Sequence, residues 1–319
     1  MTSAAAHPFA DGSVSMRLYP HNELPAGEVA AQLVSEAVTA AASGFDGVMT
    51  SEHHGGFAGY LPNPLQVTNW LVERMPHGWA AACPVLLPLR PVAAVAEEVA
   101  WLHALHPGRV GVGVAPGALP LDFEIMDVPI AEAVDRFKRD LPRLASMLRG
   151  EDLGQLAGDP ALAACATSPV PVISTAMSKP AARRAAVCGV GVIYDGGSPP
   201  ERLRTLSDAY VGSGGSGARV LVRRAWLGAP PPDLFEAQLQ VYKSYSPAAA
   251  IDQWRGTGFI CHDDPADLAD ELAGALAAAG ATCLNLRVHV PGVTAQHAHQ
   301  QIEAIGAEVL PLLRARFGT

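Results

Sequence analysis

Eight short apolar segments alternate with helical segments along this chain, and that alternation limits the folds it can adopt. The strand candidates are residues 14–19, 45–50, 79–87, 110–115, 170–175, 190–194, 219–226 and 282–288. Strands that alternate with helices pair in parallel through right-handed crossovers. Eight such units in a 319-residue chain predict an α/β fold, a (β/α)₈ TIM barrel. We expect residues 1–319 to form one barrel domain.

Two features qualify this expectation. Residues 228–262 break the rhythm with three consecutive prolines and a partly helical stretch that carries aromatic residues, so we read them as an insertion after strand seven that covers either the site or a flank of the barrel. A doubly wound sheet is the alternative fold. It usually carries a glycine-rich dinucleotide turn after its first strand, and the sequence YPHNE at 19–23 is not such a turn.

Composition excludes several classes of partner. The net charge is −9, and without a basic patch to neutralise phosphates we expect no nucleic acid to bind. No apolar run reaches the roughly 18 residues of a membrane helix. The five cysteines have no paired spacing, and the first ten residues do not read as a signal peptide. These features favour reduced thiols and a cytoplasmic protein.

The second strand ends directly in three ionisable residues, Glu52, His53 and His54. In parallel α/β folds, the chemistry lies at the carboxyl ends of the strands. A carboxylate and two imidazoles there can bind a ligand or move a proton. The alternative is an ordinary loop whose polar side chains cap the strand. A metal site is disfavoured, because successive side chains on an extended segment point in different directions.

Three stretches resemble the bacterial luciferase-like flavin monooxygenases. They are GFDGVMTSEHH at 44–54, VLLPLRPVAAVAEEVA at 85–100 and PGRVGVG at 107–113, with a weaker echo at 170–182. The resemblance implies a (β/α)₈ barrel, commonly dimeric, with a flavin at the carboxyl-end mouth. Members use reduced FMN or the deazaflavin F420, and the Glu-His-His motif is similar to that of FMN-dependent members. A small organic substrate, a separate flavin reductase and a homodimer are therefore expected.

The same resemblance assigns roles to individual residues. His53 matches the catalytic histidine of the family, and Glu52 matches a residue beside the flavin. The peptide that joins Ala82 to Cys83 matches a bond that can be cis against the flavin ring, at a cost of about 3–4 kcal/mol. A histidine that titrates near neutrality is suited to the proton step of the reaction.

The flavin phosphate needs cations or a helix N-terminus. Family members that resemble this chain use two arginines, but Pro116 and Ala133 stand at the matching positions, with Arg136 as an alternative for the second arginine. We therefore expect the phosphate at the segment after strand five, which consists of Ser174, Thr175, Ala176, Met177 and Ser178. Its hydroxyls and N–H groups can form an anion-binding nest. The alternative is a strand–helix loop in which a serine caps the helix.

Three functions remain open from the sequence. The first is a two-component monooxygenase that uses reduced FMN and oxygen. The second is an F420-dependent oxidoreductase on the same barrel. The third is a non-catalytic paralogue that acts as a binding or partner protein, because a fold does not fix a function. Residues at the other strand ends are weaker site candidates, namely Tyr19, His21, Trp226, Arg287 and His289.

Overall fold

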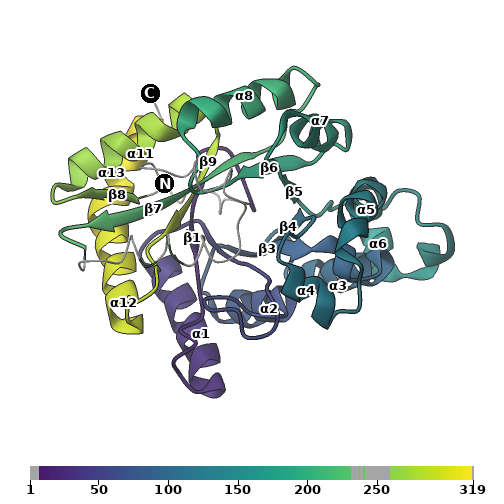
Figure 1. Cartoon of the computed structure of the whole chain (residues 1–319), viewed down its shortest axis with the longest axis horizontal. Helices are drawn as coiled ribbons and strands as arrows, with labels where there is room; N and C mark the ends of the chain where they lie inside the picture. The colour runs from purple at the N-terminus through teal and green to yellow at the C-terminus, as the bar shows by residue number, and fades with distance from the viewer. Residues whose placement is uncertain (1–6, 231–236, 238–239, 241–258, 318–319) are drawn as a thin grey trace.

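The expected barrel is present. The computed structural model describes residues 7–230, 237, 240 and 259–317, with the strands at the centre and helices around them (Figure 1). Eight parallel strands close the barrel in the order β1-β2-β3-β4-β5-β6-β7-β9, and β9 pairs back with β1. They are β1 Val14–Arg17, β2 Gly47–Thr50, β3 Trp79–Leu86, β4 Val110–Ala115, β5 Val172–Thr175, β6 Gly191–Tyr194, β7 Arg219–Leu227 and β9 Cys283–Arg287.

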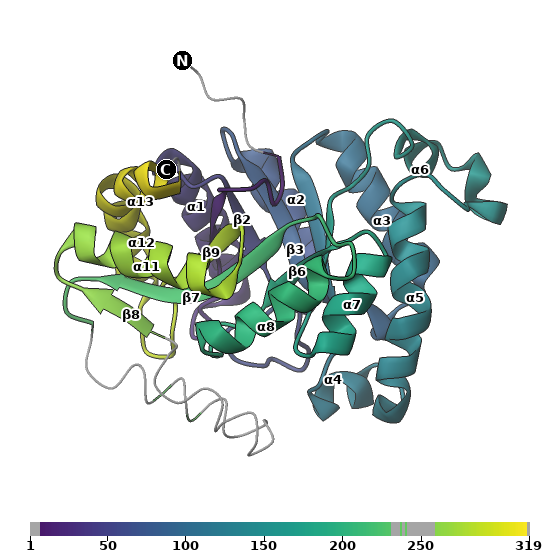
Figure 2. The same ribbon diagram turned by 90° about the horizontal axis from the view of Figure 1, so that it is seen from above.

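The helices occupy the connections between strands and cover the outside of the barrel (Figure 2). They are α1 Ala26–Ala42, α2 Pro64–Arg74, α3 Val92–Leu105, α4 Pro120–Ile125, α5 Ala133–Met147, α6 Pro160–Ala164, α7 Lys179–Val187, α8 Pro200–Val211, α11 Pro265–Ala279, α12 Ala295–Ala304 and α13 Leu310–Phe317. None of the described helices is long and apolar enough to cross a membrane.

A ninth strand, β8 Phe259–His262, was not expected. It pairs in parallel with the end of β7, Arg224–Leu227, outside the closed barrel. It lies within the segment that the sequence predicts to be an insertion, and most of that segment, 231–236, 238–239 and 241–258, lies outside the described residues. The expected helix at 295–317 is divided by a π-helical turn, Ile305–Val309, into α12 and α13.

Two layers of apolar packing hold the barrel together. The larger layer lies between the strands and the helices. The smaller one fills the interior, where the rings of Phe9 and Trp79 meet edge to face at 5.2 Å between centroids. Gly47 is required beside them, because a Cβ at this position would come within 2.1 Å of the Trp79 ring. Apolar packing therefore fills the barrel interior at the level of Phe9 and Trp79.

Strand β3 bends where the sequence places Pro84, as expected for a residue that cannot donate to the ladder. The pairing of β3 with β4 shifts register between Ala82 and Val85. The cis peptide bond joins Cys83 to Pro84. The expectation of a cis bond between Ala82 and Cys83 was therefore wrong by one residue. The physical reason is that a bond before proline has a much smaller preference for trans than any other peptide bond.

Candidate active site

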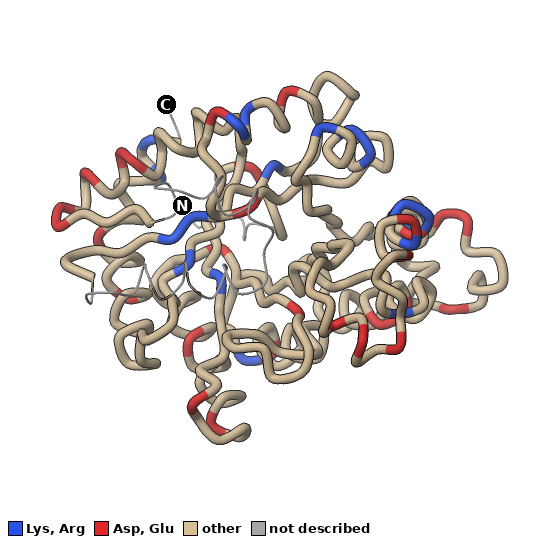
Figure 3. Tube along the Cα trace, in the orientation of Figure 1, with Lys and Arg blue, Asp and Glu red and all other residues tan. Residues whose placement is uncertain are grey.

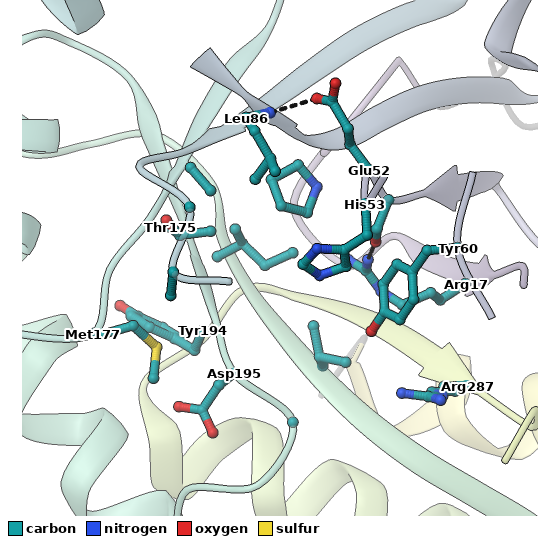
Figure 4. Close-up of a pocket in the computed structure, with 18 of the residues that line it drawn as sticks. Arg17, Glu52, His53, Tyr60, Leu86, Thr175, Met177, Tyr194, Asp195 and Arg287 are labelled. Atoms are coloured by element: carbon teal, nitrogen blue, oxygen red, sulfur yellow. Dashed lines mark hydrogen bonds between the residues drawn. The ribbon is translucent and has the colours of Figure 1, made fainter. Parts of the chain in front are cut away.

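The main cavity opens at the carboxyl ends of the strands and has a volume of about 340 Å³. Pockets of roughly 300–1,000 Å³ hold small ligands and cofactors in other proteins. Its wall includes residues at or near the ends of β1, β2, β3, β4, β5, β6, β7 and β9, so all eight barrel strands contribute to one site. Apolar side chains such as Leu86, Ile193 and Val222 line it together with charged ones (Figure 4).

His53 lies on the cavity wall and is held by a buried carboxylate. Its Nδ1 is 2.7 Å from Oδ2 of Asp122, which is fully buried on α4. The other Asp122 oxygen accepts the backbone N–H of His54 at 2.8 Å. The rings of Phe57 and Tyr60 pack against the His53 imidazole. With Nδ1 engaged by Asp122, Nε2 is the ring nitrogen left for a proton transfer, and the contacts fix the orientation of the ring.

Glu52 is buried, and protein groups hold both of its oxygens. Oε2 accepts the backbone N–H of Leu86 at 2.6 Å. Oε1 lies 3.1 Å from Nε2 of His54 and 3.5 Å from the Arg90 guanidinium. The hydrogen bond to Glu52 raises the pKa of His54, although burial opposes the shift. Glu52 therefore joins the loop after β2 to the end of β3 while it also lines the cavity.

The two adjacent histidines are used differently. His53 lines the cavity and 19% of its side chain is exposed, whereas His54 is turned to Glu52 and does not line the cavity. This placement agrees with the expectation that His53 rather than His54 meets a ligand. The catalytic role of His53 itself stays a prediction.

The remaining expected cofactor residues are divided between two places. Thr175 and Met177 line the cavity. Ala82 and Cys83 are buried beside the bend in β3, below the cavity wall, and the wall begins at Pro84. Burial raises the pKa of the Cys83 thiol, although Arg17 opposes the shift.

The segment after β5 is partly engaged by the protein itself. The N–H of Ala176 donates to the carbonyl of Ile193. The Ser178 hydroxyl accepts the N–H of Ala181 and so caps α7. Ser174 is buried and its hydroxyl donates to the Thr175 carbonyl. Thr175 and Met177 are therefore the members of this segment that reach the cavity, and a phosphate site there stays a prediction.

The sequence did not identify Asp122 as a site residue. Helix α4 is six residues long and lies between β4 and α5, in a stretch to which the sequence analysis assigned no element. The sequence feature that indicates α4 is Pro120, because proline is common at the first position of a helix. Tyr60, Asp195 and Arg224 also line the cavity and were not singled out.

Of the weaker candidates, Tyr19 and Arg287 do line the cavity. His289 packs against Tyr19 and His21, and burial lowers its pKa well below 6.5. Burial also works against a charge on His21, but Glu36 and Glu23 outweigh it and raise the pKa. His289 lines a neighbouring cavity of about 420 Å³ that shares Tyr60 and Arg287 with the main one.

Comparisons with known proteins agree with this architecture. The model of the luciferase-like monooxygenase family matches residues 13–302. An uncharacterized protein of Mycobacterium tuberculosis is 32% identical over 130 residues, which span 38% of this chain and 43% of the relative. The chain thus matches less than half the length of that relative.

Two solved structures share the fold at low identity. The oxygenating constituent of 3,6-diketocamphane monooxygenase from Pseudomonas putida, in complex with FMN, has a TM-score of 0.72 and 15% identity, and the match covers 95% of this chain and 99% of that one. An F420-dependent secondary alcohol dehydrogenase, in complex with an F420-acetone adduct, has a TM-score of 0.71 and 15% identity over the same shares.

Proposed function

This chain belongs to the luciferase-like monooxygenase family, and on that premise we propose that it is a flavin-dependent monooxygenase that uses reduced FMN and oxygen on a small organic substrate. The observation that carries the proposal is the His53–Asp122 pair on the wall of the cavity. A proton-transfer group that is positioned by a second buried group is a recurrent catalytic arrangement.

The residues around the cavity suit a flavin. The flat ring of a flavin is apolar on its faces and polar along its edge, and the wall offers Leu86, Ile193 and Val222 together with the hydroxyl of Thr175. Tyr194 also lines the cavity, but its hydroxyl is bonded to Ser207 on α8, and burial raises its pKa to about 12. Tyr194 therefore contributes packing rather than a proton, which leaves that task to His53.

Bound reduced flavin would supply the electrons that activate oxygen. The protein has three tasks around it: it excludes water, positions the substrate and moves one proton. Apolar residues of the cavity serve the first task. Nε2 of His53 would take or give the proton, while Asp122 holds the ring in one orientation and one tautomer. Glu52 keeps the loop that carries His53 fixed to β3.

The decisive experiment is an anaerobic titration of the full chain with reduced FMN and, separately, with reduced F420. We expect saturable binding of reduced FMN and fast oxidation of the bound flavin when oxygen is admitted. Binding of F420 alone would favour the dehydrogenase alternative, in line with the F420-dependent structure that shares this fold. Binding of neither cofactor would favour a non-catalytic binding protein.

The proposed function involves two protein partners, a separate flavin reductase and a second copy of this chain. Pro116 and Ala133 replace the cations expected at the flavin phosphate, so we propose that FMN is held loosely and that a separate reductase supplies it in the reduced form. We also propose a homodimer, on the basis of the family resemblance. Sedimentation of the purified chain at several concentrations tests for the homodimer, and a monomer at every concentration would contradict it.

A further inference from the structure

The neighbouring cavity of about 420 Å³, called the second cavity below, adjoins the main cavity. It lies among the loops that follow β1, β2 and β9. The Asn22 amide oxygen accepts the backbone N–H of Gly59 at 2.6 Å, which holds the loop after β2 against the loop after β1. Tyr60 and Arg287 line both cavities, so the two spaces meet at these side chains.

The junction of the two cavities lies next to the proposed proton-transfer group. The Tyr60 ring packs against the His53 imidazole with 4.5 Å between the ring centroids, and Figure 4 shows the two side chains together. Tyr60 also meets Tyr19 edge to face at 5.3 Å, and Tyr19 stacks on His289, which lines the second cavity. A ligand that fills the second cavity as far as Tyr60 therefore brings one end close to His53.

Much of the wall of the second cavity is apolar. Its apolar side chains come from all three loops and are Pro20, Phe57, Ala58, Pro291 and Val293. The segments 57–60 and 291–294 contain no charged residue, and Figure 3 draws them in tan. Burial lowers the pKa of His289 well below 6.5, so this imidazole is neutral at pH 7. The two segments and His289 therefore present an uncharged surface to a ligand.

Polar side chains of the second cavity are engaged by the protein itself. Oε1 of Glu23 lies 3.1 Å from Nδ1 of His21. The Thr294 hydroxyl accepts the N–H of His297 at 3.2 Å and so caps α12. Arg287 lies at the junction with the main cavity. A ligand in the body of the second cavity therefore meets mainly apolar groups, which favours an apolar molecule.

The proposed reaction needs room for two ligands at the same time. The main cavity, at about 340 Å³, is near the lower end of the roughly 300–1,000 Å³ range of pockets that hold one small ligand. A flavin there leaves little space for a substrate, yet the reacting atoms must come within roughly 3–3.5 Å of each other. The second cavity supplies the additional space, and it does so on the side where His53 packs against Tyr60.

We propose that the second cavity binds the substrate, that the substrate is a largely apolar molecule, and that its reacting end lies at Tyr60 beside the flavin in the main cavity. The proposal rests on the proposed function for the word substrate. The binding of an apolar molecule in the second cavity does not depend on the flavin.

A homologous series of probes tests the proposal. We would titrate the full chain with 1-butanol, 1-hexanol and 1-octanol by calorimetry without oxygen, and we expect the affinity to rise about fourfold per methylene. Ala58→Trp should lower the affinity for 1-octanol at least about tenfold, because Ala58 lines the second cavity and not the main one. Ala58→Leu should have a smaller effect. Ala278→Trp is the control, since Ala278 is an exposed residue of α11.

A competition experiment shows which cavity holds the probe. We expect 1-octanol to bind equally well with and without saturating reduced FMN, and Ala58→Trp to leave the affinity for reduced FMN unchanged. Mutual exclusion of 1-octanol and reduced FMN would place the probe in the main cavity and overturn the proposal. Absence of binding, an affinity independent of chain length, or binding that survives Ala58→Trp would overturn it as well. Length-dependent binding that Ala58→Trp abolishes, in a chain that binds no flavin, would sustain the apolar site and refute the proposed monooxygenase.

Discussion

His53 and His54 are neighbours in the chain, yet their surroundings give them separate tasks. The carboxylate of Asp122 joins them, because one oxygen meets the His53 ring and the other meets the His54 backbone. The His54 ring turns to Glu52 instead. The sequence could indicate that this tripeptide forms a site, because three ionisable residues end a strand. It could not indicate which carboxylate each ring would meet, because Asp122 is 69 residues away from His53.

Asp122 should act on catalysis through His53. We expect Asp122→Asn to slow the oxidation of bound reduced FMN by oxygen at least about tenfold, because an amide can hold the imidazole in the wrong tautomer. Affinity for reduced FMN should be unchanged, since Asp122 does not line the cavity. Rapid-mixing kinetics and an anaerobic binding titration measure the two quantities. Equal losses in rate and affinity would instead indicate a general structural role.

The His54–Glu52 contact should make stability depend on pH. The folded state raises the pKa of His54 above its ordinary 6.5. The contribution is therefore fully present below pH 6.5 and is lost as the pH rises through the folded-state pKa. We expect His54→Gln to cost roughly 1.5–3 kcal/mol at pH 5.5 and less at pH 9, as measured by urea unfolding. A cost that is the same at both pH values would show that the charge of His54 is not involved.

At the scale of elements, the barrel strands could be predicted well and the short elements could not. Most barrel strands are short, largely apolar runs bounded by turn residues, so their limits are encoded locally. Strand β8 is four residues long and only half-buried at three of them, which leaves little apolar pattern to detect. Helix α4 is similarly short. These two elements matter, since α4 supplies Asp122 and β8 pairs with the end of β7 outside the closed barrel.

The N-terminus of α7 tests the expected phosphate position. Ser178 caps this helix, and aspartate is as good a cap as serine. Ser178→Asp should therefore leave the melting temperature nearly unchanged and weaken the binding of FMN by charge repulsion, with little effect on riboflavin. Ser178→Ala is the control, because it removes the cap, costs about 1 kcal/mol, and adds no charge. If FMN binds Ser178→Asp as tightly as the native chain, the phosphate lies elsewhere.

At the scale of the whole molecule, the closed barrel gathers residues from distant parts of the sequence. Arg17 and Arg287 lie on adjacent strands β1 and β9, although they come from opposite ends of the chain. The sequence placed Arg287 at a strand end but did not single out Arg17 or Arg224, and it could not show that the three arginines line one cavity. That grouping depends on the closure of the barrel and on the register of β7 with β9.

Loose binding of the cofactor should be visible in the purified protein. Each missing charge-assisted contact to the phosphate lowers affinity by roughly 1.5–3 kcal/mol. We therefore expect a colourless protein that consumes reduced FMN only while a flavin reductase and a nicotinamide donor are present. The absorbance of the purified chain in the flavin band measures how much FMN stays bound. A yellow protein that retains FMN through gel filtration would rule out a diffusing cofactor.

In the proposed reaction His53, held by Asp122, moves the proton of a flavin-dependent oxygenation. The most direct test of this role is the rate at which oxygen oxidises reduced FMN bound to the native chain, to His53→Ala and to His54→Ala, after rapid mixing. We expect His53→Ala to lower this rate by about 10²-fold or more, with the melting temperature and the affinity for reduced FMN nearly unchanged, and His54→Ala to lower it much less. An unaltered rate in His53→Ala, or a loss confined to His54→Ala, would contradict it.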